Sequence, residues 1–150
     1  MRLIKAGTWM AAALAAATVI GTFGAGSASA SAERAFRGHT AGTIEFTSGS
    51  TATVTGSGQA TSLGNYDRLE HVTIAGGAVS GDITLTDDNT GDQIFISFAG
   101  QFVSGNDIEG TYTVTDGTGR FDGATGTATF RANTPDFVNM TATWEGTIDY

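Results

Sequence analysis

Gly110–Phe130, with the sequence GTYTVTDGTGRFDGATGTATF, is the stretch that decides the fold. Tyr112 and Val114 alternate with threonines in its first half, and Ala128 and Phe130 do so in its second half. Alternation with a period of two is typical of a strand with one buried face. The glycines between the halves allow the backbone to turn tightly. The stretch therefore predicts a strand, a turn and a second strand.

The same alternation continues through most of the chain. It predicts eight strands, at residues 36–47, 52–60, 66–74, 79–86, 94–102, 108–115, 126–130 and 138–149. The links are short, so neighbouring strands are expected to be antiparallel. Eight strands with one apolar face close most simply into an all-β, antiparallel, up-and-down barrel. A two-sheet sandwich is the alternative, because alternation does not distinguish closure from stacking.

The first thirty residues have the parts of a secretory signal peptide. Arg2 and Lys5 form a basic start, residues 6–20 are uncharged and rich in alanine, and a small-residue segment ends in Ala28-Ser29-Ala30. The apolar run is shorter than the roughly 20 residues that a membrane-spanning helix needs. The expected organisation is a signal peptide at 1–30 (with an alternative cut after residue 32), a lead-in at 31–35 and one barrel domain at 36–150.

The charge of the mature chain argues against some partners. Cleavage after residue 30 removes two of the seven basic residues and none of the fifteen acidic ones, which leaves a net charge of −10. Such a charge repels nucleic acid and anionic lipid, so neither is expected as a partner. The chain has no cysteine, and a secreted domain of this size then depends on its core or on oligomerisation. We expect a released, extracytoplasmic protein.

The turn within the opening stretch also carries a family resemblance. Residues 117–126, Gly-Thr-Gly-Arg-Phe-Asp-Gly-Ala-Thr-Gly, resemble the glycine-aromatic turn of the allene oxide cyclase and dirigent barrels. They look most similar to little-characterised secreted bacterial relatives of these proteins. Residues 61–66, Thr-Ser-Leu-Gly-Asn-Tyr, also resemble a turn of that family.

This resemblance implies an eight-stranded, calycin-like barrel of the allene oxide cyclase type, often trimeric, with an apolar cavity. Plant members of the family either cyclise an unsaturated fatty-acid epoxide or steer phenoxy-radical coupling. Their catalytic residues cannot be placed on this chain by motif, and the cysteine of the cyclases has no counterpart here. Enzymatic activity is therefore the least favoured function.

Three polar side chains of the third expected strand form the sharpest candidate site. Strict alternation would point Tyr66, Arg68 and Glu70 into the barrel, where such groups can orient a ligand or transfer protons. Buried charges would have to pair with each other or with a ligand. Alternatively, a bulge within residues 63–65 reverses the facing, so that Leu69 is buried and the charges are solvated. We favour the bulge, and no catalytic residue is assigned.

Other chemical groups have simpler interpretations. His39 and His71 lack metal-ligand spacing and a nucleophile motif, and exposed strand positions are expected for both. Asp88 and Asp92 lie in a hairpin tip with calcium-like oxygen density, but such tips also form without a metal. No metal or cofactor is expected.

The turn residues Arg120, Phe121 and Asp122 are expected to form a packed turn with an exposed ion pair. Phe95 and Val103 fall on the outer face of the most apolar strand. Because the resembled family often trimerises, this strand is predicted to contact another subunit.

The inward faces predict an apolar lining that includes Phe98, Tyr112, Met140 and Trp144. The first hypothesis is thus a secreted, non-enzymatic barrel that binds a small hydrophobic molecule in this lining. The second is a structural or surface-interaction barrel with a solid core. The third is an isomerase or coupling guide that uses the polar side chains of the third strand.

Overall fold

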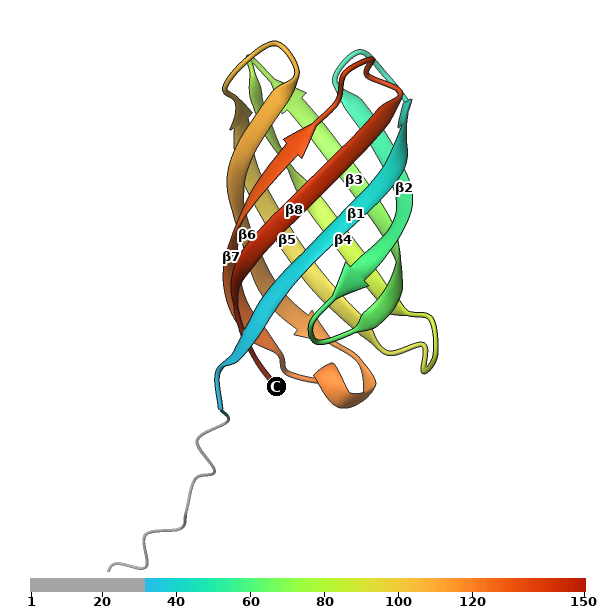
Figure 1. The fold of residues 1–150 in the computed structure, drawn as a ribbon. Helices are drawn as coiled ribbons and strands as arrows, with labels where there is room; N and C mark the ends of the chain where they lie inside the picture. Colours follow the sequence, from blue (N-terminus) through green and yellow to red (C-terminus); the bar gives the residue numbers. More distant parts are fainter. Residues whose placement is uncertain (1–31) are drawn as a thin grey trace, which may run out of the picture. The chain divides into compact units, whose positions relative to one another are not determined.

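The computed structural model describes residues 32–150, which form one closed barrel of eight antiparallel strands in sequence order (Figure 1). The strands are β1 (Arg34–Phe46), β2 (Thr51–Ala60), β3 (Gly64–Ala75), β4 (Ala78–Asp87), β5 (Gln93–Phe102), β6 (Asp107–Gly117), β7 (Thr125–Asn133) and β8 (Asn139–Asp149). A short 3₁₀ helix, η1 (Gly119–Phe121), lies between β6 and β7. No helix within the described residues is long and apolar enough to cross a membrane.

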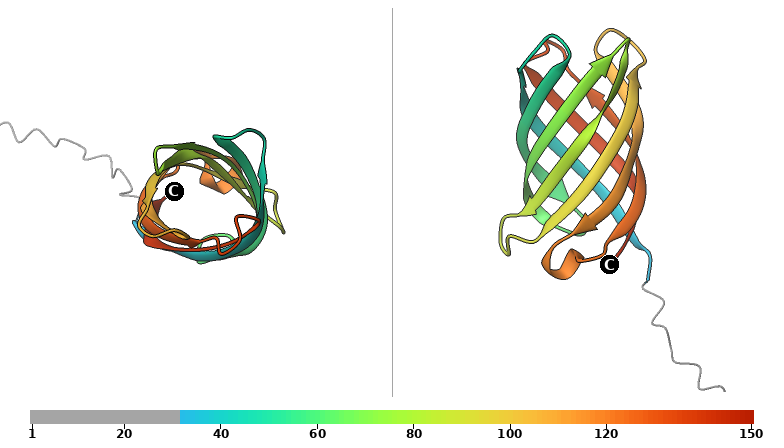
Figure 2. Two further views of the ribbon diagram at one scale, coloured as in Figure 1. Left: turned by 90° about the horizontal axis from the view of Figure 1, so that it is seen from above. Right: turned by 180° about the vertical axis from the view of Figure 1, so that it is seen from behind.

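Pairing between the first and last strands closes the sheet. β1 is hydrogen-bonded to β2 on one side and to β8 on the other, and Figure 2 shows the resulting ring from above. The predicted all-β barrel is confirmed, and the sandwich alternative is wrong. β1 begins at Arg34, so the last two residues of the expected lead-in already pair with β8. The predicted signal peptide at residues 1–30 lies outside the described residues.

Side chains alternate between the inside and the outside of the barrel, as predicted. On β5, Ile94, Ile96 and Phe98 are buried, and the side chains between them are more exposed. On β8, Met140 and Trp144 are buried and threonines face outward. Threonine suits this outer face because its branched Cβ favours an extended backbone and its hydroxyl can meet water.

β3 keeps the alternation without a break, which corrects the facing favoured from the sequence. β3 begins at Gly64, whose φ of 71° is a left-handed conformation that glycine adopts readily. From there β3 pairs continuously with β2, so Tyr66, Arg68 and Glu70 lie inside and Leu69 is 43% exposed. The register shift in this sheet is found instead between β5 and β6.

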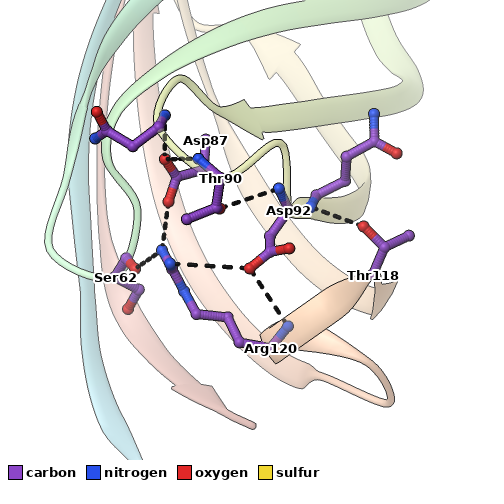
Figure 3. A network of polar contacts seen from close by, with 8 residues as sticks. Ser62, Asp87, Thr90, Asp92, Thr118 and Arg120 are labelled. Carbon is purple, nitrogen blue, oxygen red and sulfur yellow. Dashed lines mark hydrogen bonds and ion pairs between the residues drawn. The ribbon is translucent and has the colours of Figure 1, made fainter.

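One end of the barrel is closed by a polar clasp centred on Arg120 (Figure 3). This closed end carries the β2–β3, β4–β5 and β6–β7 loops. Nη2 of Arg120 donates to the Asp87 carboxylate at 2.6 Å and to the Ser62 carbonyl at 3.1 Å, and Nη1 lies 3.9 Å from the Asp92 carboxylate. Arg120 therefore joins all three loops. The neighbouring Phe121 is fully buried beneath them.

Aromatic packing fills the half of the barrel next to this end. The Trp144 ring lies 5.8 Å from the Phe36 ring and 5.9 Å from the Tyr66 ring, measured between centroids. Trp144 on β8 pairs with Gly38 on β1. A Cβ atom at Gly38 would lie 2.2 Å from a ring carbon of Trp144. Gly38 thus provides the room that the indole occupies, and this half of the barrel has a solid core.

Replacement of that glycine tests the packing. We expect Gly38→Ala to lower the free energy of unfolding by about 1–3 kcal/mol, because a buried ring must move to admit a methyl group. Gly105→Ala is the control, since a Cβ at Gly105 would meet nothing within 4 Å. Urea unfolding followed by circular dichroism measures both variants. Equal stability of the two would contradict the packing described here.

Candidate functional site

The other half of the barrel contains a cavity that opens between the β1–β2, β3–β4, β5–β6 and β7–β8 loops, which define the open end. The space open to the centres of water-sized molecules has a volume of about 60 Å³. By this measure a cavity needs roughly 10–15 Å³ to hold one water molecule. The lining is almost wholly apolar. It includes Ile44, Val54, Val72, Phe98, Phe102, Ile108, Tyr112, Phe130, Ala132, Phe137 and Met140.

The inner end of the cavity is formed by stacked aromatic rings. Tyr112 and Phe130 stack with their centroids 4.5 Å apart, and Phe98 meets Phe130 edge-on at 6.0 Å. Three of the four predicted lining residues, Phe98, Tyr112 and Met140, line the cavity. Trp144 does not, because it lies behind the Tyr112 ring at 5.8 Å, within the solid half.

A buried ion pair lies beside these rings. Arg68 and Glu70 are two residues apart on β3, and both are cavity-lining residues. Nε and Nη2 of Arg68 donate to Glu70 Oε2 at 2.9 and 2.5 Å, and Nη2 also donates to the Tyr112 hydroxyl at 3.1 Å. The Arg68 side chain is only 2% exposed. The structure therefore brings together two of the three candidate site residues and adds Tyr112, which the sequence indicated only as an apolar lining residue.

These contacts set the charge states of the pair and its neighbour. Burial alone would lower the pKa of Arg68, but the adjacent Tyr112 and Glu70 outweigh burial and raise that pKa, so the guanidinium stays charged. Burial raises the pKa of the Tyr112 hydroxyl despite the opposing charge of Arg68. Tyr112 is therefore a neutral phenol at physiological pH.

Tyr66, the third candidate, has a structural role. Its hydroxyl donates to the His39 carbonyl at 2.9 Å, and Tyr66 does not line the cavity. Burial raises its pKa to about 12. The phenol therefore stays neutral and ties β3 to β1.

The rim of the cavity carries exposed apolar side chains. Phe46 and Phe137 line the mouth, and Val103 and Val138 are exposed in the neighbouring loops of the open end. Phe137 has a φ of 57°, which is unusual for a bulky residue. The Asp136 carboxylate holds this turn by accepting the backbone N–H groups of Val138 and Asn139 at 3.0 and 2.7 Å. As a result, the Phe137 ring lies at the mouth, 6.2 Å from the Phe102 ring.

The hairpin tip with calcium-like oxygen density, residues 87–92, forms part of the Arg120 clasp. Asp87 accepts the backbone N–H groups of Asn89 and Thr90, and Asp92 faces Arg120. The hydrogen bond from the backbone of Asn89, together with the contacts of Arg120 and Thr90, holds the pKa of Asp87 below its usual value. Within residues 32–150, no three His, Asp or Glu side chains are placed to hold a metal ion.

Two turn predictions are revised by the same contacts. The ion pair of Arg120 is half-buried and not exposed. Its partner is Asp87 across the closed end, and not a residue of the same turn.

His39 and His71 are exposed strand residues, as predicted. Phe95 is half-buried and Val103, which follows β5, is exposed. Their role in a subunit contact stays a prediction.

Comparison with known proteins identifies the fold. No protein-family model and no curated protein sequence matches the chain. Among solved structures, the chain is similar to the pterocarpan synthase dirigent protein GePTS1, with a TM-score of 0.50 and 14% sequence identity over 79% of this chain and 86% of that chain. The protein therefore has a dirigent-like barrel, as the turn sequence predicted. At this identity the likeness is one of fold alone.

Removal of one partner of the buried pair tests its energetic role. We expect Arg68→Met to lower the free energy of unfolding by about 3–5 kcal/mol, because Glu70 is then buried without a counter-ion. The double variant Arg68→Met/Glu70→Leu should recover most of this loss, since apolar side chains then replace both charges.

The matched control is Arg131→Met, which breaks an exposed pair with Glu109 on the outer wall. Its effect should stay below about 1 kcal/mol. Urea unfolding measures all three variants. If Arg68→Met were as stable as Arg131→Met, the pair would not be buried as described.

Proposed function

We propose that the protein binds a small, mainly hydrophobic molecule in the cavity at the open end. The observation that carries the proposal is the contrast between the two halves of one interior. The closed half is packed with aromatic rings, whereas the open half keeps an apolar space with a mouth. Apolar concave sites with a few polar groups are typical of small-molecule binding.

Hydrophobic burial supplies the driving force for this function. Each methylene group that leaves water for an apolar site contributes about 0.8 kcal/mol. The aromatic rings at the inner end, including Phe98 and Phe130, offer flat apolar surfaces against which a ring-shaped ligand can pack. The rim residue Phe137 would cover part of such a ligand. A barrel with a purely structural role would be expected to fill this cavity with its own side chains.

The signal peptide expected at residues 1–30 supports a function outside the cytoplasm. We propose that the mature barrel binds its ligand after export, without a cofactor. The exposed apolar rim and the strand with Phe95 are compatible with a homo-oligomer, which the family resemblance also implies.

A second candidate is a guide for the coupling or cyclisation of a bound molecule. It is favoured by the fold likeness to a dirigent protein that is itself named a pterocarpan synthase. It is also favoured by Glu70, a carboxylate beside the cavity that could exchange a proton with a bound molecule. Binding in the cavity is the first step of both candidates.

Blocking the cavity tests the proposed binding. Ethylbenzene is a suitable probe, and its dissociation constant can be measured by ¹H–¹⁵N NMR titration, with shifts expected for amides around the open end. Ala132→Phe places a ring in the lining and should weaken binding about tenfold or more, a change of about 1.4 kcal/mol. Ala99→Phe, on the exposed outer face of β5, is the control and should bind as the wild type does. Equal affinities of the two variants would contradict the site.

Stereochemistry tests the second candidate. Phenoxy radicals generated by a chemical oxidant from an achiral phenol couple to racemic dimers in free solution. A barrel that guides coupling should produce an enantiomeric excess, measured by chiral chromatography, that disappears with Ala132→Phe. Racemic dimers at every protein concentration would argue against guidance and leave binding as the function.

A further inference from the structure

Arg68, one of the residues that line the cavity, has a hydrogen-bond donor that the described part of the protein does not use. Nη1 of Arg68 is buried and has no partner among residues 32–150, although Nε and Nη2 of the same guanidinium are fully engaged. Buried polar atoms are satisfied in the great majority of cases, and an unsatisfied one costs about 1–3 kcal/mol. A charged donor in an apolar site is therefore a strong signal for a missing acceptor.

A second unpartnered atom belongs to another cavity-lining residue. Of the four buried side-chain atoms that lack a partner within the described part of the chain, Arg68 Nη1 and Thr134 Oγ1 belong to residues that line the cavity, and Trp144 Nε1 and Asp149 Oδ1 do not. Arg68 is the one of the four residues in which the unpartnered atom is a charged donor, for which the cost of an unmade hydrogen bond is greatest. Apart from Glu70 and the Tyr112 hydroxyl, which Nε and Nη2 already engage, the cavity-lining side chains with an acceptor are Asn133 and Thr134, and neither bonds to Nη1.

From these observations we infer that the ligand is an uncharged molecule with an apolar body and one oxygen acceptor, which binds Arg68 Nη1 at the inner end of the cavity. This inference rests on the proposed binding function and specifies its ligand class. Aryl ketones, quinone-type carbonyls and neutral phenolic oxygens share the required acceptor. The apolar body lies against Phe98 and Phe130, toward the mouth.

The charge of the site separates this class from carboxylates. Glu70 already neutralises Arg68 through two hydrogen bonds to one carboxylate oxygen, so the pair has no net charge to offer a second anion. A ligand carboxylate would lie beside Glu70 in a poorly solvated space, and like charges repel strongly there. A neutral oxygen gains the hydrogen bond of a charged donor without this repulsion. The net negative charge of the mature chain acts in the same direction.

Three probes of similar shape test the ligand class: ethylbenzene, which has no acceptor; acetophenone, which has a neutral carbonyl; and benzoate, which is anionic. Dissociation constants come from NMR titrations of the wild type and of Arg68→Met/Glu70→Leu. The preference for acetophenone over ethylbenzene should be about tenfold greater in the wild type than in the double variant. Benzoate should bind the wild type about tenfold or more weakly than acetophenone.

The outcomes separate the inference from the function on which it rests. If ethylbenzene and acetophenone bind but their preference is unchanged in the double variant, or if benzoate binds the wild type best, the inferred ligand class is wrong and the binding function stands. If none of the three binds, the proposed function fails and the inference falls with it.

A spectroscopic measurement on the wild type keeps the test decisive should the double variant fail to fold. The carbonyl stretch of bound ¹³C-acetophenone should lie at lower frequency than in an alkane solvent, because a guanidinium donor weakens the C=O bond. A bound carbonyl with an alkane-like frequency would overturn the contact with Arg68.

Discussion

The buried pair of Arg68 and Glu70 is the constraint around which the interior of the barrel is arranged. Ions that leave water lose several kcal/mol of hydration each, and they remain buried only when their geometry compensates for this loss. Here the period of the strand places both on the same inward face, and the Tyr112 hydroxyl completes the contact. The pair lies at the inner end of the cavity. Aromatic rings can pack densely on one side of it, and the apolar space remains on the other.

The closed end gives this interior a fixed base. From the β6–β7 link, Arg120 contacts residues of the β2–β3 and β4–β5 links, so one side chain ties these three links together. The turn that contains it is built on Gly119, whose φ of 59° and closeness to the Asp92 carboxylate leave no room for a Cβ. The glycines of this turn thus serve the closure of the barrel, and the apolar cavity lies at the opposite end.

Sequence reasoning was reliable where the physics is local. A period of two is a property of neighbouring residues, so the facing of Phe98, Tyr112 and Met140 was predictable. The facing of β3 was mispredicted because a bulge was expected within residues 63–65, whereas strict alternation prevailed and each buried charge found its counter-ion on the same strand. The depth of a residue in the barrel depends on strand stagger, which no local pattern reports. For that reason the position of Trp144 behind Tyr112, and the reach of Arg120 to Asp87 over 33 residues, were not predictable.

The separation of the two ends has a consequence for how such a barrel can diversify. The strand ends and loops that surround the mouth, including those of Phe46, Val103 and Phe137, make no contact with the Arg120 clasp. Substitutions there can reshape the mouth while leaving the closure and the solid core intact. Changes at the closed end instead affect stability first. The shape of the mouth can therefore vary between barrels of this fold without loss of the fold itself.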